Sequence, residues 1–318
     1  LTANTTGANN IAIGVSTLDA NTTAHDNVAI GNSAMTASNS ADNVAIGNLA
    51  LYALTSGAQN TAVGSLALDG TDDGAKNTAV GYAALSLNCG DSNTAFGKSA
   101  LTATTGVNNT AIGESAGAGV TSGNTNILIG VNAGNETTIL TEGADNIFIG
   151  PSARGSGATV DSEISLGKDV ACTGTNNFTL GSGTTDSNIA FGGTSVTAPS
   201  DERYKEEIQD ATAGLSFIND LRPVTFKWKK EKDVPSEHRS YVEGSETRVM
   251  LSQGETNHGF IAQEVKESID SHPEIHDGFD MWSEDGTDGR QRLGPSALIP
   301  MLTKAVQELS AEIDKLKA

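Results

Sequence analysis

A short pattern of apolar and polar residues recurs along the first part of the chain. The unit is Asn-x-Ala-Ile-Gly or a close variant, and its copies end at Gly14, Gly31, Gly47, Gly64, Gly81, Gly97, Gly113, Gly130, Gly150, Gly167, Gly181 and Gly192. The first seven intervals between these glycines are 16 or 17 residues. That period is too short for a helix-turn-helix repeat and suits one coil of a β-solenoid. It predicts two short strands and two turns in each coil.

The positions within the repeat predict which residues form its core. The residue before glycine, such as Ile13, is large and apolar in every copy, so we expect it to be the core position. The residue two before glycine, such as Ala12, must face the opposite way along a strand. A small residue there indicates that another backbone approaches closely. A Leu or Met four residues after the glycine, such as Leu51, is expected to close the coil until Gly117 and Gly134 replace it.

Coils this thin bury little apolar area, and only 4% of the residues are aromatic. Stacking and side-by-side association of three chains would complete the core, so the pattern favours a homotrimer. A monomeric solenoid remains an alternative, because the length of the repeat does not show how many chains associate. A disordered Gly/Ser/Thr/Asn linker is disfavoured, because the large residue before glycine is present in every copy.

The composition changes near residue 200. Residues 1–199 contain 15 acidic and 4 basic residues, whereas residues 200–318 contain 24 and 15. Both tryptophans follow Ser200, and 28 of the 36 glycines precede it. We therefore expect a repeat solenoid over 1–153 and a separate domain over 200–318. Between them, where the spacing shortens, residues 154–199 predict a β shaft or linker, interpreted as three intertwined chains.

The second part has an α+β pattern. We expect helix over 202–220, a strand at 223–229, a strand leading into a helix around 258–270, and a long helix from about 297. The apolar positions of the last helix are spaced 4, 3, 4 and 3 residues apart, at Leu302, Val306, Leu309, Ile313 and Leu316. This heptad seam predicts a parallel three-chain coiled coil that could set the register of the trimer.

Charge and composition exclude several classes of partner. The formal charge of −20 repels phosphate backbones and anionic membranes, so we expect no nucleic acid partner. No apolar run approaches the ~20 residues of a membrane helix, so we expect no membrane insertion. Cys89 and Cys172 are interpreted as plain thiols. His272 and His276 have the spacing of a helical metal site, but Pro273 argues against it. We expect neither a metal nor a cofactor.

Four ordered motifs follow the boundary: SDERYKEEI at 200–208, LRPVTFKWK at 221–229, HGFIAQEV at 258–265 and LIPMLTKAVQELSAEIDKLK at 298–317. Together they resemble the Peptidase S74 family, the C-terminal intramolecular chaperones of phage endosialidases, tail spikes and tail fibres. The repeats over about 9–153 resemble the head repeats of trimeric autotransporter adhesins and the collar-like repeats of phage tail fibres.

The resemblance implies autoproteolysis at the Pro199–Ser200 bond by Ser200 and Lys205. A serine hydroxyl can attack the carbonyl of its own preceding peptide bond and form an ester that water hydrolyses. Lysine acts as the base only when it can release its proton near neutral pH, which burial at a subunit interface favours. Arg203 and Asp201 are expected to support the site, Arg203 by polarising the carbonyl. Lys205 could act in its own chain or on a neighbour.

A simpler interpretation of the motif is that Ser200 and Asp201 cap a helix on which Lys205 is solvated. The downstream motifs favour cleavage. The predicted function is a trimeric viral tail-fibre or spike protein for host attachment, assembled in the host cytoplasm, present in the virion and directed at an unknown cell-surface receptor. The alternatives are a bacterial trimeric surface adhesin and the stem of a polysaccharide-degrading tail spike.

Overall fold

The computed structural model describes residues 1–183, 185–193, 196–197, 200–250, 256–275, 279–284 and 289–317. The chain divides into two compact units, Leu1–Asp201 and Glu202–Ala318. Each unit folds around its own apolar core.

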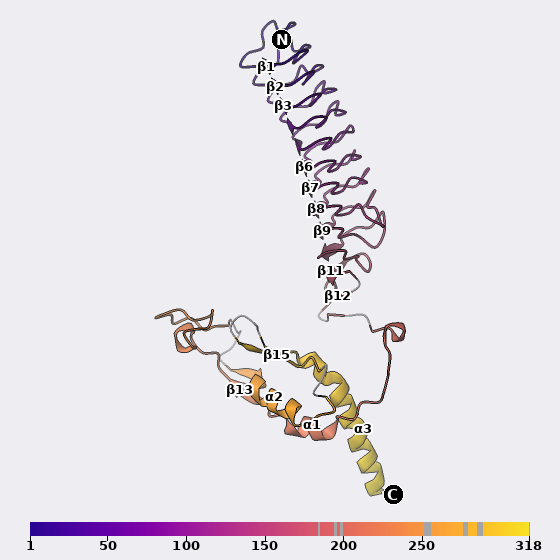
Figure 1. Ribbon diagram of the computed structural model, residues 1–318, viewed down its shortest axis with the longest axis vertical. Helices are drawn as coiled ribbons and strands as arrows, with labels where there is room; N and C mark the ends of the chain where they lie inside the picture. The colour runs from indigo at the N-terminus through magenta and orange to yellow at the C-terminus, as the bar shows by residue number, and fades with distance from the viewer. Residues whose placement is uncertain are drawn as a thin grey trace. The chain divides into compact units, whose positions relative to one another are not determined.

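The first unit is a parallel β-solenoid, as predicted (Figure 1). Ten three-residue strands stack in sequence order, each pairing in parallel with the next at a constant register. They are β1 (Ile11–Ile13), β2 (Val28–Ile30), β3 (Val44–Ile46), β4 (Thr61–Val63), β5 (Thr78–Val80), β6 (Thr94–Phe96), β7 (Thr110–Ile112), β8 (Ile127–Ile129), β9 (Ile147–Ile149) and β10 (Ile164–Leu166). β11 (Asn177–Ser182) extends the parallel stack, and β12 (Thr185–Ala190) pairs with β11 in the antiparallel sense.

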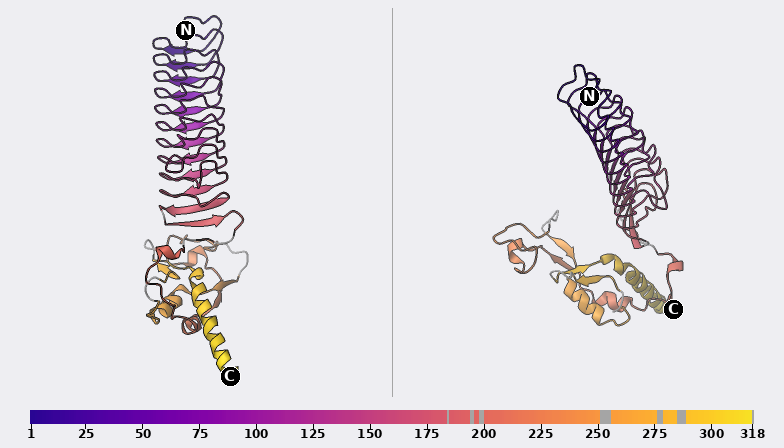
Figure 2. Two further views of the ribbon diagram at one scale, coloured as in Figure 1. Left: turned by 90° about the vertical axis from the view of Figure 1, so that its right-hand side faces the viewer. Right: turned by 45° about the horizontal axis from the view of Figure 1, so that its top comes forward.

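Each described coil has one strand, so the prediction of two strands per coil is wrong. The far side of the coil is built from turns that donate hydrogen bonds to the next coil, such as Leu51 N–H to the Ala67 carbonyl at 3.0 Å. Figure 1 shows the strands along one edge of the stack and the turns along the other, and Figure 2 shows the coils stacked one on the next. The closing Leu51 is buried, as expected, and has a left-handed φ of 51°. A residue in that conformation cannot continue a strand, which is why no second strand forms.

The invariant glycine of the repeat is required by its backbone and by its neighbour. Gly64 has a φ of 142°, and a Cβ built on it would lie 2.4 Å from the carbonyl oxygen of Gly81 in the next coil. Any other residue would be both strained and in collision with backbone.

The structure reverses the predicted facing of the strands. Ala62 and its equivalents from β2 to β7 are fully buried inside the coil, whereas Ile13 is 58% exposed and Phe96 is 56% exposed. The residue before glycine is therefore not the core position within one chain. The coil interior is so narrow that alanine from the strand fits beside the closing leucine, and the larger alternate side chain must point outward.

The coil interior stays filled with side chains where the closing leucine of the repeat is replaced by glycine. Gly117 and Gly134 occupy the left-handed corner of the closing leucine, with φ values of 59° and 70°. In the same region the buried strand alanine becomes Leu128 and then Phe148. A Cβ built on Gly117 would lie 2.6 Å from a methyl carbon of Leu128. The space left by the missing leucine is filled from the strand instead.

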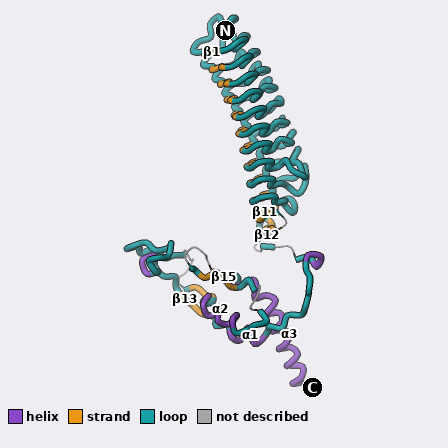
Figure 3. Tube along the Cα trace, viewed as in Figure 1, coloured by secondary structure: helices purple, strands orange, loops and turns teal. Residues whose placement is uncertain are grey.

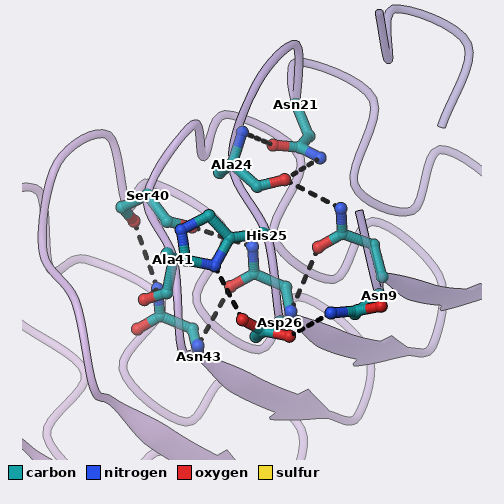
Figure 4. Close-up of polar contacts among 10 residues, drawn as sticks. Asn9, Asn21, Ala24, His25, Asp26, Ser40, Ala41 and Asn43 are labelled. Atoms are coloured by element: carbon teal, nitrogen blue, oxygen red, sulfur yellow. Dashed lines mark hydrogen bonds and ion pairs between the residues drawn. The ribbon is translucent and has the colours of Figure 1, made fainter. Parts of the chain in front are cut away.

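The asparagine that opens each repeat forms a buried ladder through the stack, whose first rungs appear in Figure 4. The Asn43 N–H donates to Oδ1 of Asn27 at 2.9 Å, and the Asn60 N–H donates to Oδ1 of Asn43 at 2.9 Å. The same bonds continue coil after coil as far as Glu163, whose N–H donates to Oδ1 of Asn146. Each amide side chain thus satisfies a backbone donor that the narrow coil has removed from water.

The second unit is a small α+β domain, as predicted (Figure 3). Its elements are η1 (Glu202–Tyr204), α1 (Leu215–Asp220), β13 (Val224–Phe226), η2 (Glu231–Asp233), β14 (Asn257–Gly259), α2 (Ala262–Asp270), β15 (Trp282–Glu284), β16 (Gln291–Leu293), η3 (Pro295–Ala297) and α3 (Leu298–Lys317). β13 pairs with β14 and β15 with β16, both antiparallel. The buried residues are Ala213, Phe217, Val265, Ile269, Ile275, Met281, Leu298 and Met301.

The helix predicted over 202–220 is wrong in its middle. Only η1 and α1 form, and the chain between them is irregular. Ile208 is the single large apolar residue between Tyr204 and Leu215, so a helix there would have no apolar face to bury.

The long C-terminal helix α3 has two apolar faces. Leu298, Met301 and Ala305 are buried against the domain, and Glu308 accepts a hydrogen bond from Leu215 N–H at 2.8 Å. The predicted seam, from Leu302 to Leu316, lies on the solvent-exposed face. Among the described residues, no helix combines the length and apolar content needed to cross a membrane.

Candidate functional site

The predicted site residues occupy one exposed stretch around η1. Ser200 precedes the turn, and the Lys205 N–H closes it by donating to the Glu202 carbonyl at 3.0 Å. Ser200, Arg203 and Lys205 are exposed, and Asp201 is half-buried. Pro199, the other half of the predicted scissile bond, lies outside the described residues.

The position of η1 between Ser200 and Lys205 determines how the two side chains could meet. On a regular helix, residues five apart point in different directions, which requires Ser200 to lie outside the helix or the lysine to come from a neighbour. Ser200 does lie before η1, and the turn is a single 3₁₀ turn that ends at Tyr204. Lys205 is solvent-exposed in one chain, whereas a lysine that acts as a base is usually buried.

The model of the Peptidase S74 family, described as chaperone of endosialidase, matches residues 200–272. Residues 200–272 are a Peptidase S74 chaperone domain. The match starts at Ser200 and spans the elements from η1 to α2. A domain of this family implies a protein of the phage tail-fibre or tail-spike type with an autoproteolytic chaperone. No curated protein and no solved structure matched the chain.

Upstream of the chaperone domain, the outward sheet face of the solenoid is a continuous apolar surface. The residue before glycine is exposed or half-buried in every strand up to β11, at Ile13, Ile30, Ile46, Val63, Val80, Phe96, Ile112, Ile129, Ile149, Leu166 and Leu180. We call this set the outer column. A monomeric solenoid would expose it along the whole stack, and contiguous exposed apolar surface of this kind marks an interface.

A cavity of about 700 Å³ lies in the chaperone domain and its C-terminal continuation. Its apolar lining includes Phe226, Trp228 and Phe260, with Met250 54% exposed to solvent. Its charged lining residues are all basic: Lys227, Lys229, Arg290 and Arg292. Sequence reasoning missed this cavity, although the alternating aromatic and basic residues of 226–229 were a signal for it.

The two thiols are poor nucleophiles. Burial raises the pKa of Cys89, and burial together with the nearby Glu163 carboxylate raises the pKa of Cys172 to about 12. Both thiols are free and buried. Glu163, also buried, accepts hydrogen bonds from the N–H and hydroxyl of Ser156 at 2.9 and 2.5 Å. Glu163, hydrogen-bonded to Ser156, is thus the last residue of the asparagine ladder.

Two histidines lie beside carboxylates. His25, Asp26 and Asp42 offer ligand atoms within 4.8 Å of one another, but all three side chains are exposed. Asp26 is held by Asn9 at 2.9 Å and by His25 at 2.7 Å (Figure 4), and these bonds lower its pKa. We assign no ion to this group. His272 contacts Asp220 and Glu274, and His276 lies outside the described residues.

Proposed function

We propose that the chain is a homotrimeric phage tail-fibre or spike segment for host attachment, and that its chaperone domain drives trimerisation and folding and then releases itself by cleaving the Pro199–Ser200 bond. One observation carries this proposal. The family match begins at Ser200, which is within two residues of the division between the two compact units. A cut there separates the solenoid from the chaperone and leaves both folds intact.

The proposed chemistry needs no external substrate. The Ser200 hydroxyl attacks the Pro199 carbonyl carbon while Lys205 accepts the hydroxyl proton. The C–N bond breaks as that proton passes to the Ser200 nitrogen, which leaves Pro199 esterified to the Ser200 oxygen. Water then hydrolyses the ester, giving a Pro199 carboxylate and a free Ser200 amine. Arg203 would stabilise the oxyanion, and Asp201 would orient Arg203 or Lys205.

Two separate surfaces support the trimer. The outer column of the solenoid and the seam of α3 are both apolar and both exposed in a single chain, and Leu316 is 87% exposed. Both run along elements that can pack side by side around a common axis. Burial of Lys205 between chains would then link cleavage to assembly.

Intact mass and N-terminal sequencing test the proposal. Wild-type protein should yield residues 1–199 and a 119-residue fragment (318 minus 199) that begins at Ser200. Ser200→Ala should leave a full-length trimer, because it removes the nucleophile without adding bulk. Lys205→Ala and Lys205→Arg should also block cleavage, since guanidinium does not release its proton at neutral pH.

Ser216→Ala and Lys315→Arg serve as matched controls, because both residues are exposed in the same unit and lie away from the motif. Both controls should cleave at the wild-type rate. A new N-terminus at another residue, or cleavage of Ser200→Ala, would overturn the mechanism. A monodisperse monomer in analytical ultracentrifugation would overturn the trimer.

A further inference from the structure

The cavity of the second unit has mainly apolar walls. Its walls come from five separate parts of the sequence, around residues 226–229, 234–240, 249–250, 260–263 and 290–293. Phe226 and Trp228 pack edge to face there with ring centroids 5.1 Å apart. A cavity of about 700 Å³ with aromatic walls is large enough for several side chains of a peptide segment.

The charge of the lining restricts what the cavity can accept. Among the described lining residues, none is acidic, and Lys227, Lys229, Arg290 and Arg292 are basic. This concentration of positive charge occurs in a chain with a formal charge of −20. A segment with an apolar centre and acidic flanks is therefore the complementary occupant.

The chain contains such a segment, directly after the cleavage motif. Residues 206–210 read Glu-Glu-Ile-Gln-Asp and are exposed throughout. Ile208 is 64% exposed, and Glu206, Glu207 and Asp210 flank it. The segment belongs to no helix or strand, so its backbone is available to pair or to dock.

We propose that residues 206–210 of one chain dock into this cavity of a second copy, with Ile208 between the aromatic walls and the acidic side chains at the basic rim. This inference rests on the proposed trimer and names one of its interfaces. In its own domain the segment does not line the cavity. It approaches α1 from the side of α3, whereas β13 and the chain after it lie on the opposite side of that domain (Figures 1 and 2).

Docking of this segment has a direct effect on the cleavage site. Lys205 immediately precedes the docked residues, so seating Ile208 in a neighbour brings Lys205 and Ser200 onto the surface of that neighbour. An exposed lysine is thereby removed from solvent only after chains have associated. Cleavage is then coupled to assembly, and an unassembled chain keeps its chaperone.

Cysteine cross-linking tests the docking independently of cleavage. Ile208→Cys and Met250→Cys are combined in the Ser200→Ala protein and treated with a short bismaleimide, with each single cysteine as a control. The native Cys89 and Cys172 are buried and serve as the background. We expect covalent dimers and trimers from the double variant only. A cross-link confined to one chain, or none above the single-cysteine controls, would overturn the proposal.

A charge swap supplies the functional test in cleavage-competent protein. Lys229→Glu and Glu206→Lys should each slow cleavage at least about 10-fold, and the pair together should recover most of the rate. Ile208→Asp should slow cleavage by a similar factor, while Val242→Asp, at an exposed apolar residue outside the cavity lining, should not. Wild-type rates for Ile208→Asp would overturn the docking, whereas cleavage of Ser200→Ala would overturn only the catalytic assignment.

Discussion

The solenoid and the chaperone domain reach a folded state by different means. The solenoid repeats the same structural features from coil to coil: a glycine with positive φ at a corner, a buried asparagine and an alanine packed against a leucine. The second unit, which contains the chaperone domain, builds a single core without repeats, with Phe217 packed edge to face on His272 and Phe279. A repeat distributes stability along its length, whereas a single core concentrates it in a few residues.

The two units share one feature, which is exposed apolar surface in a single chain. The solenoid exposes its outer column, and the chaperone domain and its continuation expose the seam of α3 and the mouth of the cavity. The comparison therefore predicts that a core mutation lowers the free energy of unfolding only of the unit that contains it. The loss should be smaller where neighbouring side chains can fill the space that the mutation leaves.

Phe217→Ala tests the concentrated core and should have the largest effect. In the Ser200→Ala protein it should lower the free energy of unfolding of the chaperone domain by about 3–5 kcal/mol, because it opens a cavity at the centre of that core. Trp228 and Trp282 both lie in this unit, so urea unfolding followed by tryptophan fluorescence reports on it alone. Phe191→Ala, at an exposed phenylalanine of the solenoid unit, should leave the transition unchanged.

Leu128→Ala and Gly117→Leu test volume exchange between neighbouring coils. Leu128→Ala alone should cost about 2–5 kcal/mol by leaving a void, and Gly117→Leu alone about 1–3 kcal/mol by overpacking. The double variant restores the pattern of the earlier coils, where Leu101 adopts the same left-handed backbone beside Ala111. Thermal unfolding followed by circular dichroism should show a double-variant cost well below the sum. Additive costs would contradict compensation.

Asn93→Ala tests the distributed ladder. Oδ1 of Asn93 accepts the Asn109 N–H at 3.0 Å, and its side-chain amide donates to the Gly106 carbonyl at 2.8 Å. Removing both should cost about 1–3 kcal/mol, because a buried donor and a buried acceptor lose their partners. Asn48→Ala, at an exposed asparagine, should be neutral in the same thermal assay. Equal effects at the two positions would contradict the ladder.

His272 should give the smallest effect. Its ring contacts Asp220 at 2.9 Å and Glu274 at 3.1 Å, and the hydrogen bond to Asp220 chiefly raises its pKa. A raised pKa stabilises the fold below about pH 6.5, and that contribution is lost as pH rises through the folded value. Wild type minus His272→Gln should therefore lose less than about 1 kcal/mol on going from acidic to alkaline pH in urea unfolding. His258→Gln is the exposed control, and a difference that grows with pH would reverse the assignment.

The solenoid could be predicted from the recurring Asn-x-Ala-Ile-Gly motif, because each copy forms one strand that stacks in register on the next, even where the coil between them is 20 or 14 residues long. The direction of the strand side chains, into or out of the coil, could not be predicted from the sequence. Ala62 and Val63 are both apolar, and the width of the coil decides which one is inside. α3 follows from its heptad spacing, whereas the predicted helix over 202–220 fails because it contains too few apolar residues. The alternation of aromatic and basic residues at 226–229 points to one wall of the cavity, but its other walls do not follow from the sequence, since residues such as Met250 and Arg292 join them only through the tertiary fold.

The motif predicts Ser200 and Lys205 as the reacting pair, and the family match begins at the first of them. Their relation to Pro199, Asp201 and Arg203 across an assembled trimer stays a prediction. Side-chain placement at a subunit interface depends on surfaces that one chain does not contain.

The constant register of the strands means that the length of the solenoid depends only on the number of its coils. Thr61 aligns with Thr78 and Val63 with Val80, so coils that differ in sequence are interchangeable in position. Deleting residues 61–77 would join Asn60 to Thr78 and remove one coil, shortening the stack by about 4.8 Å without shifting any other pairing. Gain or loss of whole coils can thus change the length of the solenoid in fixed steps, while the domain that follows stays unaltered.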